Sequence, residues 1–352
     1  MTIDLDDVRA VRDQDPGDML AAVAALGAHF REGYSNGAAA SGLPDLVDVR
    51  SVVFCGMGGS AVAGDVLRSV FRDRLGVPVE VNRSPELPEH AGPHSLVIAS
   101  SYSGNTSETL ASFREATKRG CRAIVVSSGG TIVDEAVEAG VPVVRVPGGF
   151  QPRAALGWLA STALGALEAA GLLPPLAEDV AEAAGEADAR AASCGPDTPA
   201  GENPAKRLAE EIEERIPVIW GAEGIGAVAA ARWKTQCNEN GKVPAWWASM
   251  SELDHNEVVG WTEPFGRAHS VIALRHEAED PEIAARFPLS LRIAADSGAD
   301  THEVWATGRS ALARLVSLIA LGDFVSAYLA IRKGVDPTPV VVIERLKAAL
   351  VS

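Results

Sequence analysis

The sequence predicts an α/β protein built around two doubly wound parallel sheets. Short apolar runs alternate with helical patterns along most of its 352 residues. These runs are nearly continuous in apolar residues, which is typical of strands covered by helices on both faces of a parallel sheet. The alternation breaks once, at the turn-rich SCGPDTPAGENP of 193–204, and then restarts. A chain of this length commonly folds as two domains, so we expect one sheet in each half.

The first half contains a regular series of elements. Apolar residues at helical spacing predict a helix over 18–32, before the first strand. We expect buried strands at 51–55, 77–81, 95–100, 122–127 and 141–146. The helices expected between these strands lie at 61–72, 107–119 and 131–139.

The second half repeats this pattern. We expect strands at 216–221, 270–275, 289–294 and 301–306, with an Ala-rich helix after the first. The longest apolar stretch, 311–331, is interrupted by Arg314 and Asp323, which predicts a buried helix rather than a membrane span.

A weak internal repeat favours duplication of one fold. SVVFCGMGGSAVAGDVLR (51–68) and IPVIWGAEGIGAVAAARWK (216–234) share a strand, a glycine turn and an Ala-rich helix, although convergence is the plain alternative. We therefore expect four segments along the chain. They are an N-terminal helical segment at 1–34, a first sheet domain at 35–172, a helical linker at 173–204 and a second sheet domain at 205–352.

Charge and cysteine content narrow the classes of function. The chain has 31 Lys and Arg against 47 Asp and Glu, and its net charge of −16 argues against nucleic acid or an anionic membrane as a partner. Its four cysteines form neither a disulfide framework nor a pattern with metal-ligand spacing. The N-terminus lacks the apolar core of a signal peptide. We expect a soluble cytoplasmic protein.

Two loops of the first domain have the composition of an anion site. GMGGS at 56–60 follows a strand and opens a helix, and its glycines let the backbone approach a ligand while helix-start amides favour negative charge. SYSGNT at 101–106 has the same kind of position and offers hydroxyl donors. Two such loops on neighbouring strands favour a phosphate monoester. The second domain has Glu223 in its glycine turn, so we expect one phosphate site per chain.

Each loop also has an ordinary explanation. GMGGSA fits the dinucleotide fingerprint G-x-G-x-x-A, with Glu80 lying 22 residues beyond Gly58, where a ribose-binding acid would sit. Asn105 and Glu108 fit a capping box at the start of a helix. A cap needs one hydroxyl, however, whereas SYSGNTS offers several around a single turn.

Several motifs along the chain resemble one family. GMGGSAVAGD and SYSGNTSETL look like the phosphosugar-binding loops of SIS (sugar isomerase) domains. QPRAALG, NENGK, ELDHNEVVGW and the terminal DPTPVVVIERLK are similar to the bifunctional phosphoglucose/phosphomannose isomerases. The resemblance covers essentially the whole chain. It implies two SIS-type, flavodoxin-like subdomains, and a homodimer that interconverts glucose 6-phosphate, mannose 6-phosphate and fructose 6-phosphate without metal or cofactor.

The resemblance also implies roles for particular residues. The phosphate contacts carry over to Gly58, Gly59, Ser60, Ser101, Ser103 and Thr106. Glu239 matches the base, Arg153 the cation that stabilises the enediolate, and His255 the ring-opening group, supplied to the neighbouring subunit's site. The C-terminal lysine matches Lys347, with Lys333 as the alternative. Taken singly, each of these side chains is more often an ordinary surface residue.

Three other functions compete with this interpretation. A non-catalytic phosphosugar sensor would need the loops but not the combination of Glu239, His255 and Arg153. An NAD-dependent oxidoreductase would use GMGGSA. A diverged isomerase would act on another phosphosugar, such as an amino sugar. Zinc-dependent mannose phosphate isomerisation is disfavoured, because the seven histidines show no ligand spacing.

Overall fold

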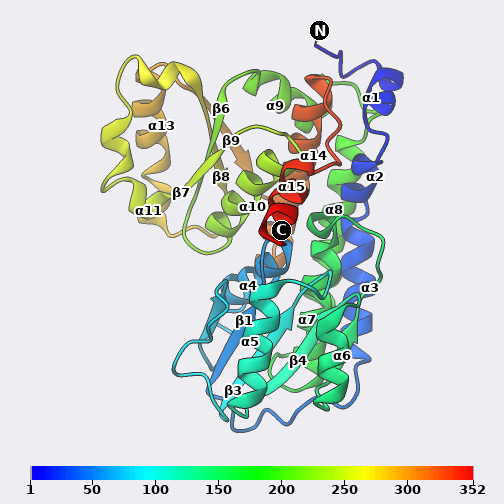
Figure 1. Cartoon of the computed structure of the whole chain (residues 1–352). Helices are drawn as coiled ribbons and strands as arrows, with labels where there is room; N and C mark the ends of the chain where they lie inside the picture. The colour runs from blue at the N-terminus through cyan, green and yellow to red at the C-terminus, as the bar shows by residue number, and fades with distance from the viewer. Residues whose placement is uncertain (1, 352) are drawn as a thin grey trace. The chain divides into compact units, whose positions relative to one another are not determined.

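The fold contains two parallel sheets, one in each of two compact units (Figure 1). The computed structural model describes residues 2–351, and of 347, 350 and 351 it describes the backbone alone. The predicted α/β class with two parallel sheets is confirmed.

The two units are discontinuous in sequence. The N-sheet unit comprises Ala25–Asp188 and Gly308–Val316. The C-sheet unit comprises the chain up to Ala24, Ala189–Thr307 and the chain from Ser317 onward. The domain boundaries expected from the sequence, at residues 34, 172 and 204, stay a prediction.

The N-sheet unit has five parallel strands in the order β2-β1-β3-β4-β5. They are β1 (Ser51–Cys55), β2 (Val79–Asn82), β3 (Ser95–Ser100), β4 (Arg122–Ser127) and β5 (Val143–Arg145). This is a doubly wound order, because the chain adds β2 on one side of β1 and then crosses to add β3 on the other. The strands predicted for this half are confirmed, with ends that differ by at most two residues.

Helices cover both faces of this sheet, which explains its continuous apolar strands. α4 (Gly59–Val70) lies against Phe54, whose ring contacts Gly64. α5 (Ser107–Lys118) and α6 (Thr131–Glu138) pack on the opposite face, around Val125. The unit also contains α3 (Leu26–Ala38), the 3-10 helix η1 (Pro152–Ala155), α7 (Leu156–Ala169) and most of α8 (Ala177–Cys194).

The sheet of the C-sheet unit repeats this topology with four parallel strands, in the order β7-β6-β8-β9. They are β6 (Ile216–Gly221), β7 (Trp246–Ser249), β8 (His269–Arg275) and β9 (Asp300–Trp305). Its longer helices are α9 (Pro204–Ile212), α10 (Ile225–Glu239), α13 (Phe287–Asp296), most of α14 (Ala311–Arg332) and α15 (Val341–Val351). Shorter ones are α1 (Val8–Gln14), α2 (Met19–Ala24), α11 (Met250–Leu253), η2 (Glu257–Gly260), η3 (Phe265–Ala268) and α12 (Pro281–Ala284).

The strand predicted at 289–294 is wrong, and one strand of the second half, β7, was not predicted. The segment 289–294 lies in helix α13, where Leu291 and Ala294 face the core while Leu289 is exposed. An apolar run this short does not distinguish strand from helix by periodicity. β7 is an edge strand whose residues Trp246 and Trp247 are both exposed, so it lacks the buried apolar signature of its neighbours.

The helix predicted over 18–32 is also interrupted. The structure has two helices there, α2 and α3, and they meet at Ala25. Asp15 starts α2, because its carboxylate accepts hydrogen bonds from the amides of Met19 and Leu20, both at 2.8 Å. An apolar pattern that continues across Ala25 does not reveal this break.

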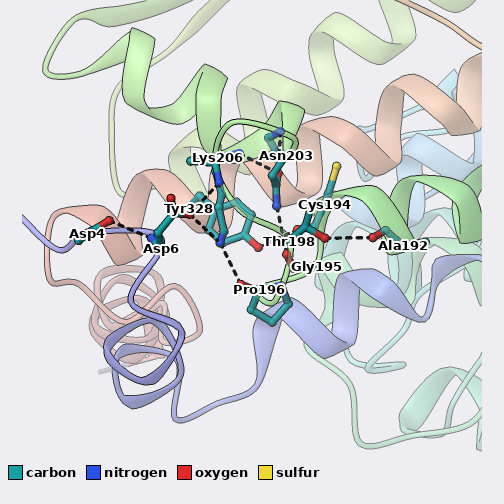
Figure 2. Close-up of polar contacts among 12 residues, drawn as sticks. Asp4, Asp6, Ala192, Cys194, Gly195, Pro196, Thr198, Asn203, Lys206 and Tyr328 are labelled. Atoms are coloured by element: carbon teal, nitrogen blue, oxygen red, sulfur yellow. Dashed lines mark hydrogen bonds and ion pairs between the residues drawn. The ribbon is translucent and has the colours of Figure 1, made fainter.

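The turn-rich segment at 193–204 is ordered around a buried lysine (Figure 2). Lys206 donates from Nζ to the carbonyl oxygen of Pro196 at 2.9 Å, and its Nζ lies 3.6 Å from Asp6 Oδ1. The Tyr328 hydroxyl donates to the carbonyl oxygen of Cys194 at 2.7 Å. Burial lowers the pKa of Lys206 and raises the pKa of Tyr328. Lys206 thus joins the start of α9 to the N-terminal arm and to the segment 193–204, and Tyr328 joins that segment to α14.

Among the described residues, α14 is the one helix long and apolar enough to cross a membrane by length and composition. Nearly all of its apolar window is buried inside the structure, as expected of a core helix. It contains a buried ion pair with α10, in which Arg232 donates from Nε to Asp323 Oδ1 at 3.1 Å and from Nη2 to Oδ2 at 2.9 Å. Both side chains are at most 5% exposed.

We predict that Asp323→Asn lowers the free energy of unfolding by about 3 kcal/mol, because it leaves the guanidinium of Arg232 buried without this carboxylate. Urea-induced unfolding measures the effect. Glu135→Gln is the matched control, since it removes an exposed ion pair with Arg114 and should change stability little. Similar losses in both variants would contradict the importance of the buried pair.

Candidate active site

The two predicted phosphate loops meet at the point where the strand order of the N-sheet unit reverses. β1 ends at Cys55, which pairs with Ala99 near the end of β3. The loops 56–60 and 101–106 therefore leave the same edge of the sheet, where ligands of doubly wound folds bind. The amide of Tyr102 donates to Ser60 Oγ at 3.3 Å, which joins one loop directly to the other.

The first loop leaves the amino end of α4 without a side-chain cap. Gly58 precedes the helix with φ 53° and ψ −129°, a conformation that residues with a side chain rarely adopt. A Cβ atom at this position would meet no atom within 4 Å, so the loop faces open space there. Amides at an uncapped helix start favour a negatively charged ligand.

The second loop divides its hydroxyl groups between two tasks. Ser101 is buried, and its hydroxyl donates to Thr106 Oγ1 at 3.1 Å and accepts from the amide of Gly104 at 3.1 Å. Ser103 is exposed, and Thr106 is half-buried at the start of α5, where it makes no capping hydrogen bond. Ser101 thus holds the turn, while Ser103 and Thr106 are the more accessible hydroxyls. A contact of Ser101 with phosphate stays a prediction.

A third loop, after β4, supports the second by direct backbone contact. A Cβ atom on Gly104 would lie 1.7 Å from the carbonyl oxygen of Gly129, so this position accepts only glycine. Asn105 Oδ1 accepts from the amide of Thr131 at 3.0 Å and from its hydroxyl at 2.9 Å. Asn105 therefore anchors the start of α6, and the N-cap residue of α5 is Thr106 rather than Asn105.

Arg153 lies beside the first loop, in η1. A Cβ atom on Gly59 would lie 3.0 Å from the carbonyl oxygen of Pro152 and 3.5 Å from Arg153 Cα, so the loop and η1 touch through their backbones. The side chain of Arg153 is buried. The N-sheet unit thus brings together the predicted arginine and all six predicted phosphate-loop residues.

Tyr102 is a positioning residue that the sequence motifs do not predict. Its hydroxyl donates to the carbonyl oxygen of Pro147 at 3.1 Å and accepts from the amide of Phe150 at 2.9 Å. Burial raises the pKa of Tyr102, so it remains a donor at neutral pH. The tyrosine ties the second loop to the segment that leads into η1. An aromatic residue inside a loop of serines and glycines is the signal that points to it.

The C-sheet unit holds Glu239 at the end of α10. This glutamate is half-buried, and Lys242 Nζ donates to its backbone carbonyl. The same Nζ donates to the carbonyl oxygens of Pro337 and Pro339, at 2.9 and 2.6 Å. Lys242, which has φ 53°, therefore connects the end of α10 to the segment before α15. Its sequence context, NENGK, gives no indication of this role.

The predicted lysine lies outside the described side chains. Lys347 lies on α15, and of this residue the structure describes only the backbone. Lys333, the alternative, directly follows α14. The choice between the two lysines stays a prediction.

Glu239 and His255 lie at opposite ends of the strands of the C-sheet, one at the amino ends and the other at the carboxyl ends. α10 begins just beyond the carboxyl end of β6 and packs along β6 and β7, so its 15 residues run back for about 22 Å. Glu239 is therefore near the amino end of β7. His255 follows the carboxyl end of β7 after the single turn of α11, because β7 is parallel to β6. Within one chain, these two residues are therefore not placed at the same end of the strands of this sheet.

His255 is exposed, and among residues 2–351 its imidazole has no hydrogen-bond or ion-pair partner in the same chain. The surrounding segments expose several large apolar side chains. They are Trp246, Trp247, Val259 and Phe265. The imidazole of His255 is therefore open to solvent in this chain.

No group of three or more His, Cys, Asp or Glu in the part of the chain that the structure describes is placed to hold a metal ion. The polar groups near the two loops are hydroxyls, amides and a guanidinium, which bind anions rather than cations.

The fold and the loops define a protein with two SIS domains. The SIS domain family matches residues 45–139, and the bacterial phospho-glucose isomerase C-terminal SIS domain matches residues 201–350. A hypothetical protein from Thermus thermophilus has the same fold, with a TM-score of 0.75 at 18% identity over 97% of this chain and 93% of that one.

Two relatives identify the family more closely. The bifunctional phosphoglucose/phosphomannose isomerase of Caldicellulosiruptor bescii is 38% identical, covering 86% of this chain and 90% of that protein. The enzyme of the same name from Aquifex aeolicus is 36% identical, covering 87% and 92%. The chain belongs to the bifunctional phosphoglucose/phosphomannose isomerase family, and it is an enzyme of that family.

We predict that Gly104→Ala lowers the free energy of unfolding by at least about 2 kcal/mol, because its methyl group collides with the backbone of Gly129 at a positive φ. Thermal unfolding followed by circular dichroism measures the change. Gly185→Ala is the control, since a methyl group there meets no atom within 4 Å and alanine favours helix α8. Equal stability of Gly104→Ala and wild type would contradict the close loop contact.

Proposed function

We propose that this enzyme interconverts glucose 6-phosphate, mannose 6-phosphate and fructose 6-phosphate through an enediolate, without a metal ion. The observation that carries the proposal is the meeting of two anion-type loops and Arg153 at the switch point of the N-sheet. Membership of the isomerase family supports the choice of substrates. The enzyme acts in the cytoplasm on small phosphosugars, with neither nucleic acid nor a membrane as a partner.

The phosphate group of the substrate binds at the carboxyl edge of the N-sheet. Backbone amides at Gly58 and Gly59 and the hydroxyls of Ser60, Ser103 and Thr106 donate to its oxygens. The Ser60 amide itself already donates to the carbonyl oxygen of Met57 at 3.1 Å. Ser101 is the remaining candidate contact. Its hydroxyl donates to phosphate when it gives up its hydrogen bond to Thr106 Oγ1. Because this site uses amides and hydroxyls, it binds an anion in a chain whose net charge is −16.

The isomerisation moves a proton between C1 and C2 of the open sugar. Glu239 removes the carbon-bound proton and returns it to the neighbouring carbon, so the carboxylate is regenerated in each turnover. Negative charge develops on oxygen in the enediolate. A buried guanidinium stabilises such charge more strongly than an exposed one, which suits Arg153 to this task.

Ring opening comes before isomerisation and requires a proton transfer from the anomeric hydroxyl to the ring oxygen. His255 accepts the hydroxyl proton, because histidine exchanges protons near neutral pH. Lys347, or Lys333, donates to the ring oxygen. A planar enediolate is common to both C2 epimers, so one site serves glucose and mannose phosphates.

We predict that purified enzyme with EDTA converts glucose 6-phosphate and mannose 6-phosphate to fructose 6-phosphate. Glu239→Gln should lower kcat at least about 100-fold for both substrates, since it removes the base. Glu138→Gln is the matched control, because Glu138 also ends a helix but lies in α6, and it should retain full activity.

Loss of both activities on EDTA treatment, restored by a metal ion, would contradict the metal-free mechanism. Binding of both sugars by wild type without turnover would instead favour the sensor function. Turnover of an amino sugar phosphate in place of both hexose phosphates would favour the diverged isomerase.

We also propose that the enzyme is a homodimer in which His255 completes the partner's active site. Glu239 and His255 lie at opposite ends of the strands of the C-sheet. For both to act on the same sugar molecule, His255 must therefore come from a second chain. The exposed apolar residues Trp246, Trp247, Val259 and Phe265 lie near His255 in the sequence and suit a subunit interface.

This proposal predicts complementation between two inactive variants. When Glu239→Gln and His255→Ala chains exchange subunits in equal amounts, half of the dimers contain one of each, and each of those has one intact site of two. Activity should therefore recover to about one quarter of wild type in a C2 dimer. Unmixed variants are the controls, and the absence of recovery after exchange would place both residues in the same chain's site.

A further inference from the structure

A polar cavity of about 280 Å³ lies in the C-sheet unit, away from every residue assigned above. The end of α8, α9, β9 and α14 form its wall. β9 is an edge strand, so its outer side is open to this cavity rather than to another described strand. The wall residues that matter here are Arg190, Arg207, Glu211, His302 and Trp305.

Two guanidinium groups of the wall are not neutralised by carboxylates. Neither Arg190 nor Arg207 forms an ion pair with any residue in the described part of the chain. Arg190 donates from Nη2 to the carbonyl oxygen of Trp305 at 3.2 Å, which holds it against β9. Arg207 is exposed on α9. In a chain of net charge −16, two such cations beside one cavity indicate an anionic ligand.

The carboxylates of the wall are already held by other groups. Glu303 accepts a hydrogen bond from Arg275 Nη1 at 2.6 Å. Glu211 Oε2 lies 3.3 Å from His302 Nδ1. Neither carboxylate is within ion-pair distance of Arg190 or Arg207 among the described contacts, so the two guanidinium groups remain available to a ligand.

Two nitrogen atoms of the wall residues are also unused by the fold. Arg190 Nε and His302 Nε2 are buried without a hydrogen-bond partner among the described protein atoms. Buried polar atoms in folded proteins nearly always have a partner. Burial lowers the pKa of His302, so its ring adds no third positive charge at neutral pH. Arg190 Nε and His302 Nε2 therefore form no hydrogen bond that holds α8, α9 and β9 together, and both remain able to bind a ligand.

We propose that this cavity is a second anion site, which binds a small phosphate ester through the guanidinium groups of Arg190 and Arg207. A tetrahedral dianion has enough oxygens to accept from two guanidinium forks at once, whereas one carboxylate is filled by a single fork. A volume near 280 Å³ accommodates a phosphate group with a chain of about three or four carbon atoms. The half-exposed ring of Trp305 forms an apolar side of the cavity.

Glycerol 3-phosphate is a suitable probe, titrated calorimetrically into the full-length enzyme. The titration uses a Ser103→Ala/Thr106→Val background, because the phosphate loops also bind phosphate esters. We expect glycerol 3-phosphate to bind this background and uncharged glycerol not to bind. Arg207→Gln in the same background should weaken binding about tenfold, the loss expected for one charge-assisted contact. Arg190→Gln should weaken it similarly.

Arg292→Gln is the matched control, since Arg292 is exposed on α13 outside the cavity. It should leave the affinity unchanged. Arg207→Gln removes no side-chain hydrogen bond or ion pair among the described residues, and thermal unfolding of the variant checks that it remains folded. The proposal is overturned if the arginine variants bind as well as the background, or if the background alone no longer binds the probe. Isomerase turnover by wild type is measured separately, so failure of this site leaves the proposed activity standing.

Discussion

The candidate site depends on backbone-to-backbone contact between loops at the carboxyl edge of the N-sheet. Gly104 touches the loop after β4, and Gly59 touches η1, with no room for a side chain at the first and little at the second. Tyr102 then joins the second loop to the segment before η1 through two hydrogen bonds. Flexible hydroxyl loops would have to be ordered on binding, whereas these are already fixed by their neighbours. The position of Arg153 follows from the same contacts.

Net charge says little about such a site. The chain is strongly acidic. Yet the switch point of the N-sheet presents helix-start amides, hydroxyls and one buried arginine, all of which favour an anion. The corresponding turn of the C-sheet unit has Glu223, whose carboxylate accepts from Ser249 Oγ at 3.1 Å. The two units therefore share a strand order around the first strand of each sheet, while the chemistry of the turn differs between them.

The sequence predicts the core strands and the two loops well, because buried parallel strands and glycine turns have strong local signals. It fails where the signal is not local. The run 289–294 is apolar in either a strand or a helix, and only packing decides that Leu291 is buried and Leu289 exposed. The roles of Tyr102 and Lys242 rest on contacts with residues 45 or more positions away. The opposite placement of Glu239 and His255 follows from strand direction, which spacing alone does not give.

The central claim is that Glu239 moves a carbon-bound proton through an enediolate. The most direct measurement is conversion of glucose 6-phosphate in deuterium oxide, followed by proton NMR of the fructose 6-phosphate formed. A base that exchanges its proton with solvent introduces deuterium at C1, and Glu239→Gln forms almost no product. Fructose 6-phosphate that still contains no deuterium after prolonged incubation at equilibrium would indicate direct hydride transfer, because repeated turnover lets even a shielded carboxyl group exchange its proton with solvent. Deuterium incorporation at the wild-type rate by Glu239→Gln would assign the base to another residue, and either result would contradict the account.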